Sequence, residues 1–210
     1  MSISLNAKDL LLVIDVQYDF LPGGSLAVAG GDEIIPLINQ LGSKFANVAL
    51  TQDWHPAGHI SFASSHPGKV PFELIALPYG QQVLWPDHCV QGTHGAEISA
   101  AIELPHAQLI IRKGYHGDVD SYSGFQEADR ATKTGLAGYL TERGITRLFV
   151  VGLATDFCVG WSALDAQSAG FETYVVEDAC RAIDANGSLA AAWHAMAAAG
   201  VKRITSGEIA

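Results

Sequence analysis

Four apolar, strand-like segments of the sequence each lead into a side chain that can take part in catalysis. Two of these side chains are carboxylates, one is an amine and one is a thiol: Asp15, Asp53, Lys113 and Cys158. Any one of them alone is more often a residue that simply leaves the core at the end of a strand. In an open parallel sheet, however, ligands bind outside the carboxyl ends of the strands. The four side chains together therefore predict an active site at that edge.

Cys158 follows the fourth of these segments, in the sequence GLATDFC, where small and turn-prone residues predict a strand that passes into a helix. At a helix N-terminus the macrodipole favours a thiolate, and the free N–H groups of the first turn can bind an oxyanion. A buried structural cysteine is the usual alternative. The position of Cys158 alone does not decide between a catalytic nucleophile and a structural cysteine.

A thiol nucleophile needs a proton acceptor. Asp15 is a better candidate than a histidine for this acceptor. The first strand is normally central in this topology, and among the histidines only His116 lies near the ends of the first, third and fourth segments. Lys113 would then neutralise Asp15 and Cys158 together and orient both side chains. A solvated lysine is a serious alternative for Lys113.

Asp53 begins a second group, whose residue types are those of metal ligands. In an extended segment residues i and i+2 point the same way, so Asp53 and His55 can bind one ion. His88 lies in LWPDHC, a rigid, turn-forming stretch that can return a ligand to them, and His59 is a weaker candidate. One carboxylate and two imidazoles suit zinc, iron(II) or manganese. A D-x-H pair by itself is weak support for a metal.

Aromatic residues lie close to the same strand ends. Phe20 follows the first strand, Tyr122 follows the third, and Trp85 lies in the long connection before it. A flat substrate could be sandwiched among the three rings. Each ring taken alone is more often an ordinary core or rim residue.

The elements that must position these residues alternate between apolar strands and helices. Near-continuous apolar runs indicate strands that are covered on both faces. The alternation predicts a three-layer α/β/α fold with a six-stranded, mainly parallel, Rossmann-like sheet, in which the first and fourth strands lie near the centre. The expected strands are 10–15, 47–51, 108–114, 147–154, 172–179 and 201–206, and the expected helices are 32–45, 96–103, 133–143, 158–169 and 188–199.

One segment interrupts this alternation. Residues 54–103 separate the second and third strands, which is too long for a simple crossover. Long excursions in compact domains are usually functional or mobile. We therefore expect a small lobe over the active site, inserted between strands 2 and 3 of a single domain that covers residues 1–210.

Composition argues against several other classes of protein. The 210 residues are 49% hydrophobic and 16% charged, which allows a sizeable core. The net charge of −10 and the lack of a basic run argue against nucleic acid or an anionic membrane as partner. Three cysteines, no cationic leader and no membrane-length apolar run predict a cytoplasmic protein with reduced thiols. The oligomeric state stays open.

Five stretches of the sequence, which together span residues 10–169, form one recognisable set: LLVIDVQYDF, TQDWHPAGHISFASSHPG, LWPDHCVQGTHGAE, RKGYHGDVDSYSGF and GLATDFCVGWSALDA. The set resembles the isochorismatase-like cysteine hydrolases, and within them the nicotinamidase/pyrazinamidase branch. The Asp-Lys-Cys combination marks the wider family, whereas DWH together with WPDHC marks its metal-containing nicotinamidases.

The resemblance implies an activity and a role for each candidate residue. The activity is hydrolysis of nicotinamide to nicotinate and ammonia through a thioester, and of pyrazinamide as well, within NAD salvage. The resemblance assigns the catalytic triad to Asp15, Lys113 and Cys158, and one divalent ion, with zinc favoured over iron or manganese, to Asp53, His55 and His88. His59 matches a ligand position of some members only.

The resemblance also makes a structural prediction about the turn before Cys158. It implies a cis peptide bond between Leu153 and Ala154, with the amides of Ala154 and Cys158 as the oxyanion hole. Non-proline cis bonds are rare and concentrate at functional sites. The pocket residues implied by the resemblance are Phe20, Trp85 and Tyr122.

Two other functions compete with this interpretation. A metal-free amidohydrolase of the same family, acting on a carbamoyl or ureido substrate, would have no use for a convergence of Asp53, His55 and His88. A non-catalytic, thiol-containing binding module is compatible with the fold alone. Against such a module, the sequence has no G-x-G-x-x-G after the first strand and no C-x-x-C.

Overall fold

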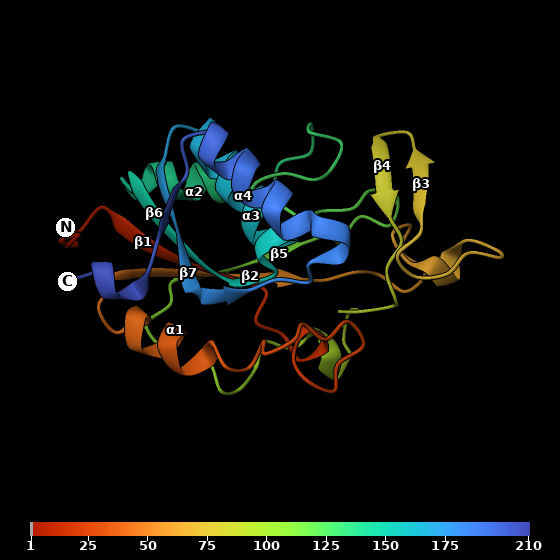
Figure 1. Cartoon of the computed structure of the whole chain (residues 1–210), viewed down its shortest axis with the longest axis horizontal. Coiled ribbons are helices and arrows are strands. Elements are labelled where there is room, and N and C mark those ends of the chain that lie inside the picture. The colour runs from red at the N-terminus through yellow and green to blue at the C-terminus, as the bar shows by residue number, and fades with distance from the viewer. Residues whose placement is uncertain (1) are drawn as a thin grey trace.

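A six-stranded parallel sheet forms the centre of the protein, of which the computed structural model describes residues 2–210 (Figure 1). The strand order is β5-β2-β1-β6-β7-β8, and every neighbouring pair is parallel. The first and fourth expected strands do lie at the centre, and the third is the edge strand beside the second. The strands are β1 (Asp9–Ile14), β2 (Asn47–Asp53), β5 (Leu109–Lys113), β6 (Arg147–Leu153), β7 (Glu172–Arg181) and β8 (Lys202–Ile204).

Helices cover both faces of this sheet, as the near-continuous apolar strands predict (Figure 1). Helix α1 (Ile35–Gly42) packs on one face through Ile35, Ile38 and Leu41. The opposite face carries α2 (Leu136–Glu142), α3 (Gly160–Ser168) and α4 (Ser188–Ala198) over a second apolar cluster. The three-layer architecture is confirmed.

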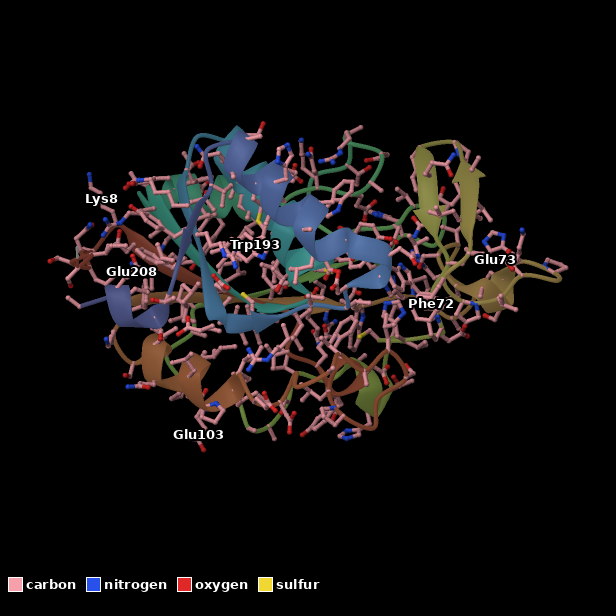
Figure 2. All side chains as sticks on the ribbon, viewed as in Figure 1. Lys8, Phe72, Glu73, Glu103, Trp193 and Glu208 are labelled. Atoms are coloured by element: carbon pink, nitrogen blue, oxygen red, sulfur yellow. The ribbon has the colours of Figure 1, made fainter. Side chains whose placement is uncertain are left out.

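The long connection after β2 forms a lobe that projects from one end of the sheet. Its tip carries a small antiparallel hairpin of β3 (Leu74–Leu77) and β4 (Gly80–Val83). Phe72 and Glu73 lie on this lobe, at the opposite end of the molecule from Lys8 and Glu208 (Figure 2). Because the lobe lies at the carboxyl ends of the strands, it can contribute walls to a site there.

The helix expected at residues 96–103 does not form, so this prediction was wrong. Only a 3-10 turn, His94–Ala96, is present. The backbone that follows is used in other contacts: Ile98 pairs with Gln17, and the amide of Asn39 binds the Ala101 carbonyl. The apolar residues Ile98 and Ile102 of this segment pack against the same apolar cluster as α1 without forming a helix.

The remaining boundaries differ from the expectations by a few residues. Strand β2 continues to Asp53, so that Asp53 is its last residue. The turn before α3 is a π-helix, Thr155–Val159, which contains Cys158. No helix within residues 2–210 has both the length and the apolar character needed to cross a membrane.

Candidate active site

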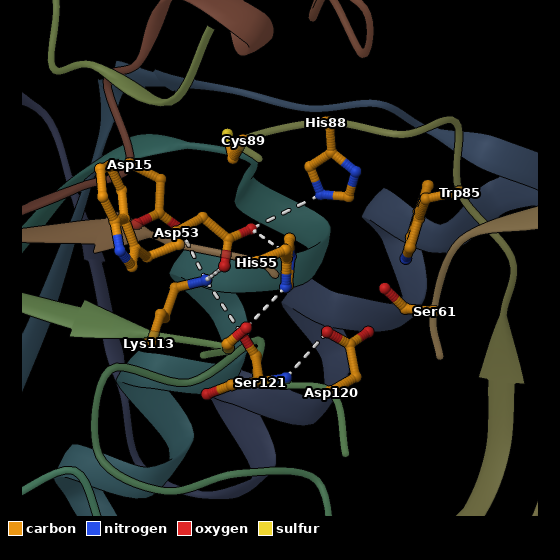
Figure 3. A network of polar contacts seen from close by, with 12 residues as sticks. Asp15, Asp53, His55, Ser61, Trp85, His88, Cys89, Lys113, Asp120 and Ser121 are labelled. Atoms are coloured by element: carbon orange, nitrogen blue, oxygen red, sulfur yellow. Dashed lines mark hydrogen bonds and ion pairs between the residues drawn. The ribbon is translucent and has the colours of Figure 1, made fainter. Parts of the chain in front are cut away.

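Lys113, the last residue of β5, is the centre of a buried polar network (Figure 3). Its Nζ lies 2.9 Å from Asp15 Oδ2, 3.1 Å from Asp53 Oδ1 and 3.4 Å from Cys158 Sγ. It also donates to the carbonyl of Ser121 at 2.9 Å. Burial alone would lower the pKa of Lys113, but the two carboxylates outweigh burial and raise it well above its ordinary value. Lys113 is therefore a buried cation and not the solvated lysine of the alternative interpretation.

Asp15 directly follows β1, in a left-handed backbone conformation with φ +48° that aspartate tolerates better than most residues. Thr51 Oγ1 donates to its Oδ1 at 2.5 Å. Its Oδ2 lies beside Lys113 but receives no well-aligned hydrogen bond from residues 2–210, which leaves a lone pair for a proton. Burial raises the pKa of Asp15, and this outweighs the lowering effect of Lys113. Such a carboxylate is suited to act as a general base.

Cys158 lies in the π-helical turn that follows β6, and a glycine near the end of β6 allows this strand to approach β1 closely. Gly152 has φ +115°, and a Cβ there would lie 2.2 Å from the Ile14 carbonyl oxygen of β1. Burial raises the pKa of the Cys158 thiol well above its ordinary value, and Lys113 offsets only part of that effect. The thiolate expected from the helix macrodipole is thus not favoured, because desolvation outweighs the neighbouring positive charge of Lys113. A nucleophilic role for this thiol would require a neighbouring base to take its proton.

The peptide bond between Leu153 and Ala154 is cis, as predicted. The carbonyl of Ala154 accepts hydrogen bonds from the N–H groups of Phe157 and Val159. These bonds fix the turn in which the amides of Ala154 and Cys158 lie. The turn that carries both amides therefore has a defined conformation next to the thiol.

Asp53, His55 and His88 converge beside this network, with one potential ligand atom of each within 4.8 Å of the others. Asp53 Oδ2 lies 3.1 Å from His55 Nε2 and 3.5 Å from His88 Nε2. Asp53 thus presents one carboxylate oxygen to Lys113 and the other to the two imidazoles. One carboxylate and two imidazoles form a common ligand set for zinc and related divalent ions.

Backbone carbonyls orient both imidazoles for metal binding. His55 Nδ1 lies 2.8 Å from the Gly114 carbonyl oxygen, and His88 Nδ1 lies 2.8 Å from that of Pro86. An N–H donated from Nδ1 leaves the lone pair of Nε2 free for an ion, which is the usual arrangement of metal-binding histidines. Gly114 must be glycine, because a Cβ there would lie 2.5 Å from the His55 ring. The residues fit a divalent ion well.

His59 is adjacent to this set but lies outside it. Its Nδ1 is 2.7 Å from Ser61 Oγ, and its Nε2 faces the carbonyls of His116 and Val119 at 3.0 and 3.1 Å. Burial and the neighbouring His55 lower its pKa to about 4. Both ring nitrogens therefore have partners within the protein, while a carboxylate oxygen of Asp120 completes a second possible group with His55 and His59.

A buried pocket connects the thiol with the three potential metal ligands. The indole Nε1 of Trp85 donates to the Tyr122 hydroxyl at 3.0 Å, which fixes both rings. Phe157 packs edge-on against Trp85, with ring centroids 4.9 Å apart, and was not predicted although it directly precedes Cys158. The pocket is lined by Phe20, Leu26, Asp53, His55, Trp85, His88, Asp120, Tyr122, Ala154, Phe157, Cys158 and Ile183.

Gln17 is a second residue that the sequence interpretation missed. It is fully buried, and its amide makes a two-way pair with the backbone of Asp53: Nε2 donates to the carbonyl at 2.8 Å, and Oε1 accepts from the N–H at 2.7 Å. Nε2 also donates to the carbonyl of Ala96. Gln17 stands two residues after Asp15, so it ties the backbone next to the base to the backbone of a metal-ligand candidate. In the sequence, only the position of Gln17 in DVQ, two residues after Asp15, could have indicated that it lies near the site.

The chain is similar to proteins of one enzyme family along nearly its whole length. The model of the isochorismatase domain matches residues 9–208. A nicotinamidase from Acinetobacter baylyi is 64% identical over 199 residues, which cover 95% of this chain and 93% of that protein. A nicotinamidase from Escherichia coli is 41% identical, and 83% of each chain is covered.

Solved structures agree with these similarities. A nicotinamidase/pyrazinamidase from Acinetobacter baumanii has a TM-score of 0.96 at 62% identity, covering 97% of this chain and 98% of its own. An L. infantum protein in complex with nicotinate has a TM-score of 0.88 at 37% identity, covering 100% and 99%. A Pyrococcus horikoshii pyrazinamidase in complex with zinc has a TM-score of 0.77 at 37% identity, covering 94% and 99%.

Proposed function

The chain belongs to the isochorismatase family, and on that premise we propose that it is a nicotinamidase, which hydrolyses nicotinamide to nicotinate and ammonia. One observation carries the proposal: Cys158 lines the same pocket as Asp53, His55 and His88, and the buried Lys113 contacts both the Cys158 thiol and the Asp15 carboxylate. Pyrazinamide is expected to react as well, because one of its two ring nitrogens is meta to the carboxamide, as the ring nitrogen of nicotinamide is. The reaction would serve NAD salvage in the cytoplasm.

We infer that Asp53, His55 and His88 hold one divalent ion. A divalent ion at that position would act as a Lewis acid and accept the lone pair of a ring nitrogen of the substrate. Zinc is favoured by the zinc complex of the Pyrococcus relative, and iron(II) and manganese suit the same ligands. Asp53 raises the pKa of His55 despite burial, so protons compete with a metal for this ligand.

Bond formation begins at Cys158. Asp15 takes the thiol proton, and Sγ attacks the amide carbon, while Lys113 stabilises the charges that this transfer separates. The amides of Ala154 and Cys158 meet the oxygen that becomes negative. Removing one such donor typically costs about 2.7–4 kcal/mol of transition-state stabilisation. Asp15 then gives its proton to the leaving nitrogen, the C–N bond breaks, and ammonia departs from a nicotinoyl thioester.

Hydrolysis of the thioester repeats the same proton transfers with water. Asp15 takes a proton from water, the new C–O bond forms, and the C–S bond breaks. The proton returns to Sγ and nicotinate is released. Asp15 thus acts first as base and then as acid in each of the two half-reactions, as covalent catalysis requires of a single residue beside the nucleophile.

The aromatic side chains orient the flat ring during both steps. Trp85 and Tyr122 hold each other through a hydrogen bond, and Phe157 packs against both rings. Their apolar surfaces exclude water from the reacting carbon, and the ring nitrogen faces the imidazoles of His55 and His88. The pocket therefore selects an aromatic amide that carries a ring nitrogen.

Ammonia release from three amides by the purified, metal-loaded protein tests this function. Nicotinamide and pyrazinamide are expected to be hydrolysed. Benzamide has the same shape but no ring nitrogen, and is expected to react at least about 100-fold more slowly, because a polar site loses its partner. Equal turnover of benzamide and nicotinamide would contradict the role of the ring nitrogen, and turnover of none of them would contradict the proposed activity.

A further inference from the structure

Asp120 is a buried carboxylate in the pocket wall to which the reaction above gives no role. Its side chain is 2% exposed, and it lines the same pocket as Asp53 and Cys158. Figure 3 shows it beside Ser121, from whose backbone N–H it accepts a hydrogen bond. One of its oxygens lies within 4.8 Å of a ring nitrogen of His55.

The hydrogen bonds of Asp120 are those of an ionised carboxylate. Oδ1 accepts from the backbone N–H of Ser121 at 2.8 Å, and Oδ2 accepts from Gln82 Nε2 at 2.7 Å. Both partners are neutral donors. Among residues 2–210 no lysine, arginine or histidine forms an ion pair with Asp120. A buried charge without a counter-charge is costly, so the pocket needs a cation near it.

The buried charges around the pocket identify the kind of cation. Asp15, Asp53 and Asp120 contribute three negative charges, and Lys113 contributes one positive charge. With the imidazoles neutral, as metal ligands must be, the sum is −2. A divalent ion cancels this charge, whereas a monovalent ion does not.

We propose that Asp120 is the carboxylate that balances the charge of the divalent ion from outside the ligand set of Asp53, His55 and His88. Asp120 does not itself complete that set, because its oxygens are not within 4.8 Å of all three ligand atoms. Its effect is electrostatic, through the low-dielectric pocket. The inference rests on the metal site proposed above and adds to it a residue that determines metal affinity.

Affinity for Co²⁺ tests this inference, because Co²⁺ reports both binding and ligand identity through its visible absorption. The full-length protein is equilibrated at pH 7.5 in Co²⁺–chelator buffers. Asp120→Asn is expected to weaken Co²⁺ binding about 10- to 100-fold, as is typical when a partner beyond the ligands is lost. The absorption bands of the bound ion are expected to stay where they are, since the ligands are unchanged. Asp120→Glu keeps the charge and is expected to bind more tightly than Asp120→Asn.

Two control variants separate charge from structure. Asp118→Asn removes the same charge from an exposed position in the same loop and is expected to change the affinity by no more than about fivefold. Gln82→Leu removes the hydrogen bond to Asp120 but leaves its charge, and is expected to retain most of the affinity.

Each outcome decides the inference. Unchanged affinity in Asp120→Asn, an equal loss in Gln82→Leu, or a weaker Asp120→Glu than Asp120→Asn would overturn it. Shifted absorption bands in Asp120→Asn would also overturn it, because they would make Asp120 a ligand. These results would leave the proposed activity intact, whereas a wild-type protein that binds no Co²⁺ would contradict the metal site itself.

Discussion

At the scale of single residues, one buried ammonium group connects the ionisable side chains of the site. Lys113 contacts both carboxylates and the thiol within 3.4 Å, yet burial keeps the thiol protonated. The result is a neutral nucleophile beside a base whose pKa burial has raised. In the proposed reaction, proton transfer from Cys158 to Asp15 leaves a thiolate beside the ammonium group of Lys113, and this positive charge stabilises the thiolate as it forms.

Thr51→Val tests whether Asp15 is the base. Burial raises the pKa of Asp15, and the Thr51 hydroxyl partly lowers it. Without that hydrogen bond the pKa rises further, so the ionised base is available only at higher pH. The acidic limb of the kcat/KM profile is expected to move up by about one pH unit, the equivalent of one hydrogen bond to a charged group.

The matched control for this change is Thr173→Val. Thr173 is also a buried threonine in a strand, but its hydroxyl bonds the Phe171 carbonyl, away from the pocket. Thr173→Val is expected to lower the free energy of unfolding but to leave the acidic limb of the kcat/KM profile where it is. An acidic limb that stays in place, or moves to lower pH, in Thr51→Val would mean that another group is the base.

At the scale of elements, the site depends on how the ends of neighbouring strands are held together. Strands β1 and β2 pair from Leu10 to Val13, and the side chain of Gln17 then bonds the backbone of Asp53 as a further ladder residue would. Asp15 at the end of one strand and Asp53 at the end of the other are thereby fixed relative to each other. The same side chain, Gln17, therefore helps to position both the proposed base, Asp15, and the proposed metal ligand, Asp53.

Gln17→Glu tests this positioning role. The variant keeps the shape but replaces two buried N–H donations, to the carbonyls of Asp53 and Ala96, by a carboxylate. The free energy of unfolding is expected to fall by about 2–5 kcal/mol, because buried acceptors lose their donor and a charge is buried. Gln91→Glu, in an exposed amide that bonds the Trp54 carbonyl, is expected to change it by less than about 0.5 kcal/mol. Similar unfolding curves for the two variants would contradict the role of Gln17.

Elements with a strong local pattern could be predicted from the sequence, and those made by tertiary contacts could not. The apolar runs located β1, β2, β5, β6, β7 and β8, since strands covered on both faces must be apolar throughout. The segment 96–103 had a helix-like pattern, but its backbone pairs with Gln17 and Asn39. The π-helical turn around Cys158 also has no local signature.

At the scale of the whole molecule, the pocket combines residues from distant parts of the chain. Phe20 follows β1, His88 comes from the lobe, and Ile183 follows β7. The strand ends and the resemblance together predicted that the triad candidates and the three metal-ligand candidates lie near one another, and the structure brings these side chains together. Gln17, Asp120 and Phe157 escaped prediction, because a buried amide, carboxylate or ring is recognised only when its partners are known.

Removal of the metal is expected to lower the stability of the whole fold. Asp53 from β2 and His88 from the lobe converge with His55, so an ion would tie the lobe to the sheet. An ion at 100 times its Kd adds about 2.7 kcal/mol to the free energy of unfolding. Tm is therefore expected to fall on chelation and to return with added Zn²⁺. Identical melting curves for the loaded and the chelated protein would contradict a metal that joins these elements.

The most direct measurement of the central claim is ammonia release from nicotinamide by Cys158→Ala beside the wild type, with bound metal quantified in both. The account predicts a loss of turnover of at least about 10⁴-fold, because no other group in the pocket can form the thioester. Metal content and nicotinamide binding are expected to persist, since Cys158 is not a ligand. Turnover retained in Cys158→Ala would contradict the thiol mechanism.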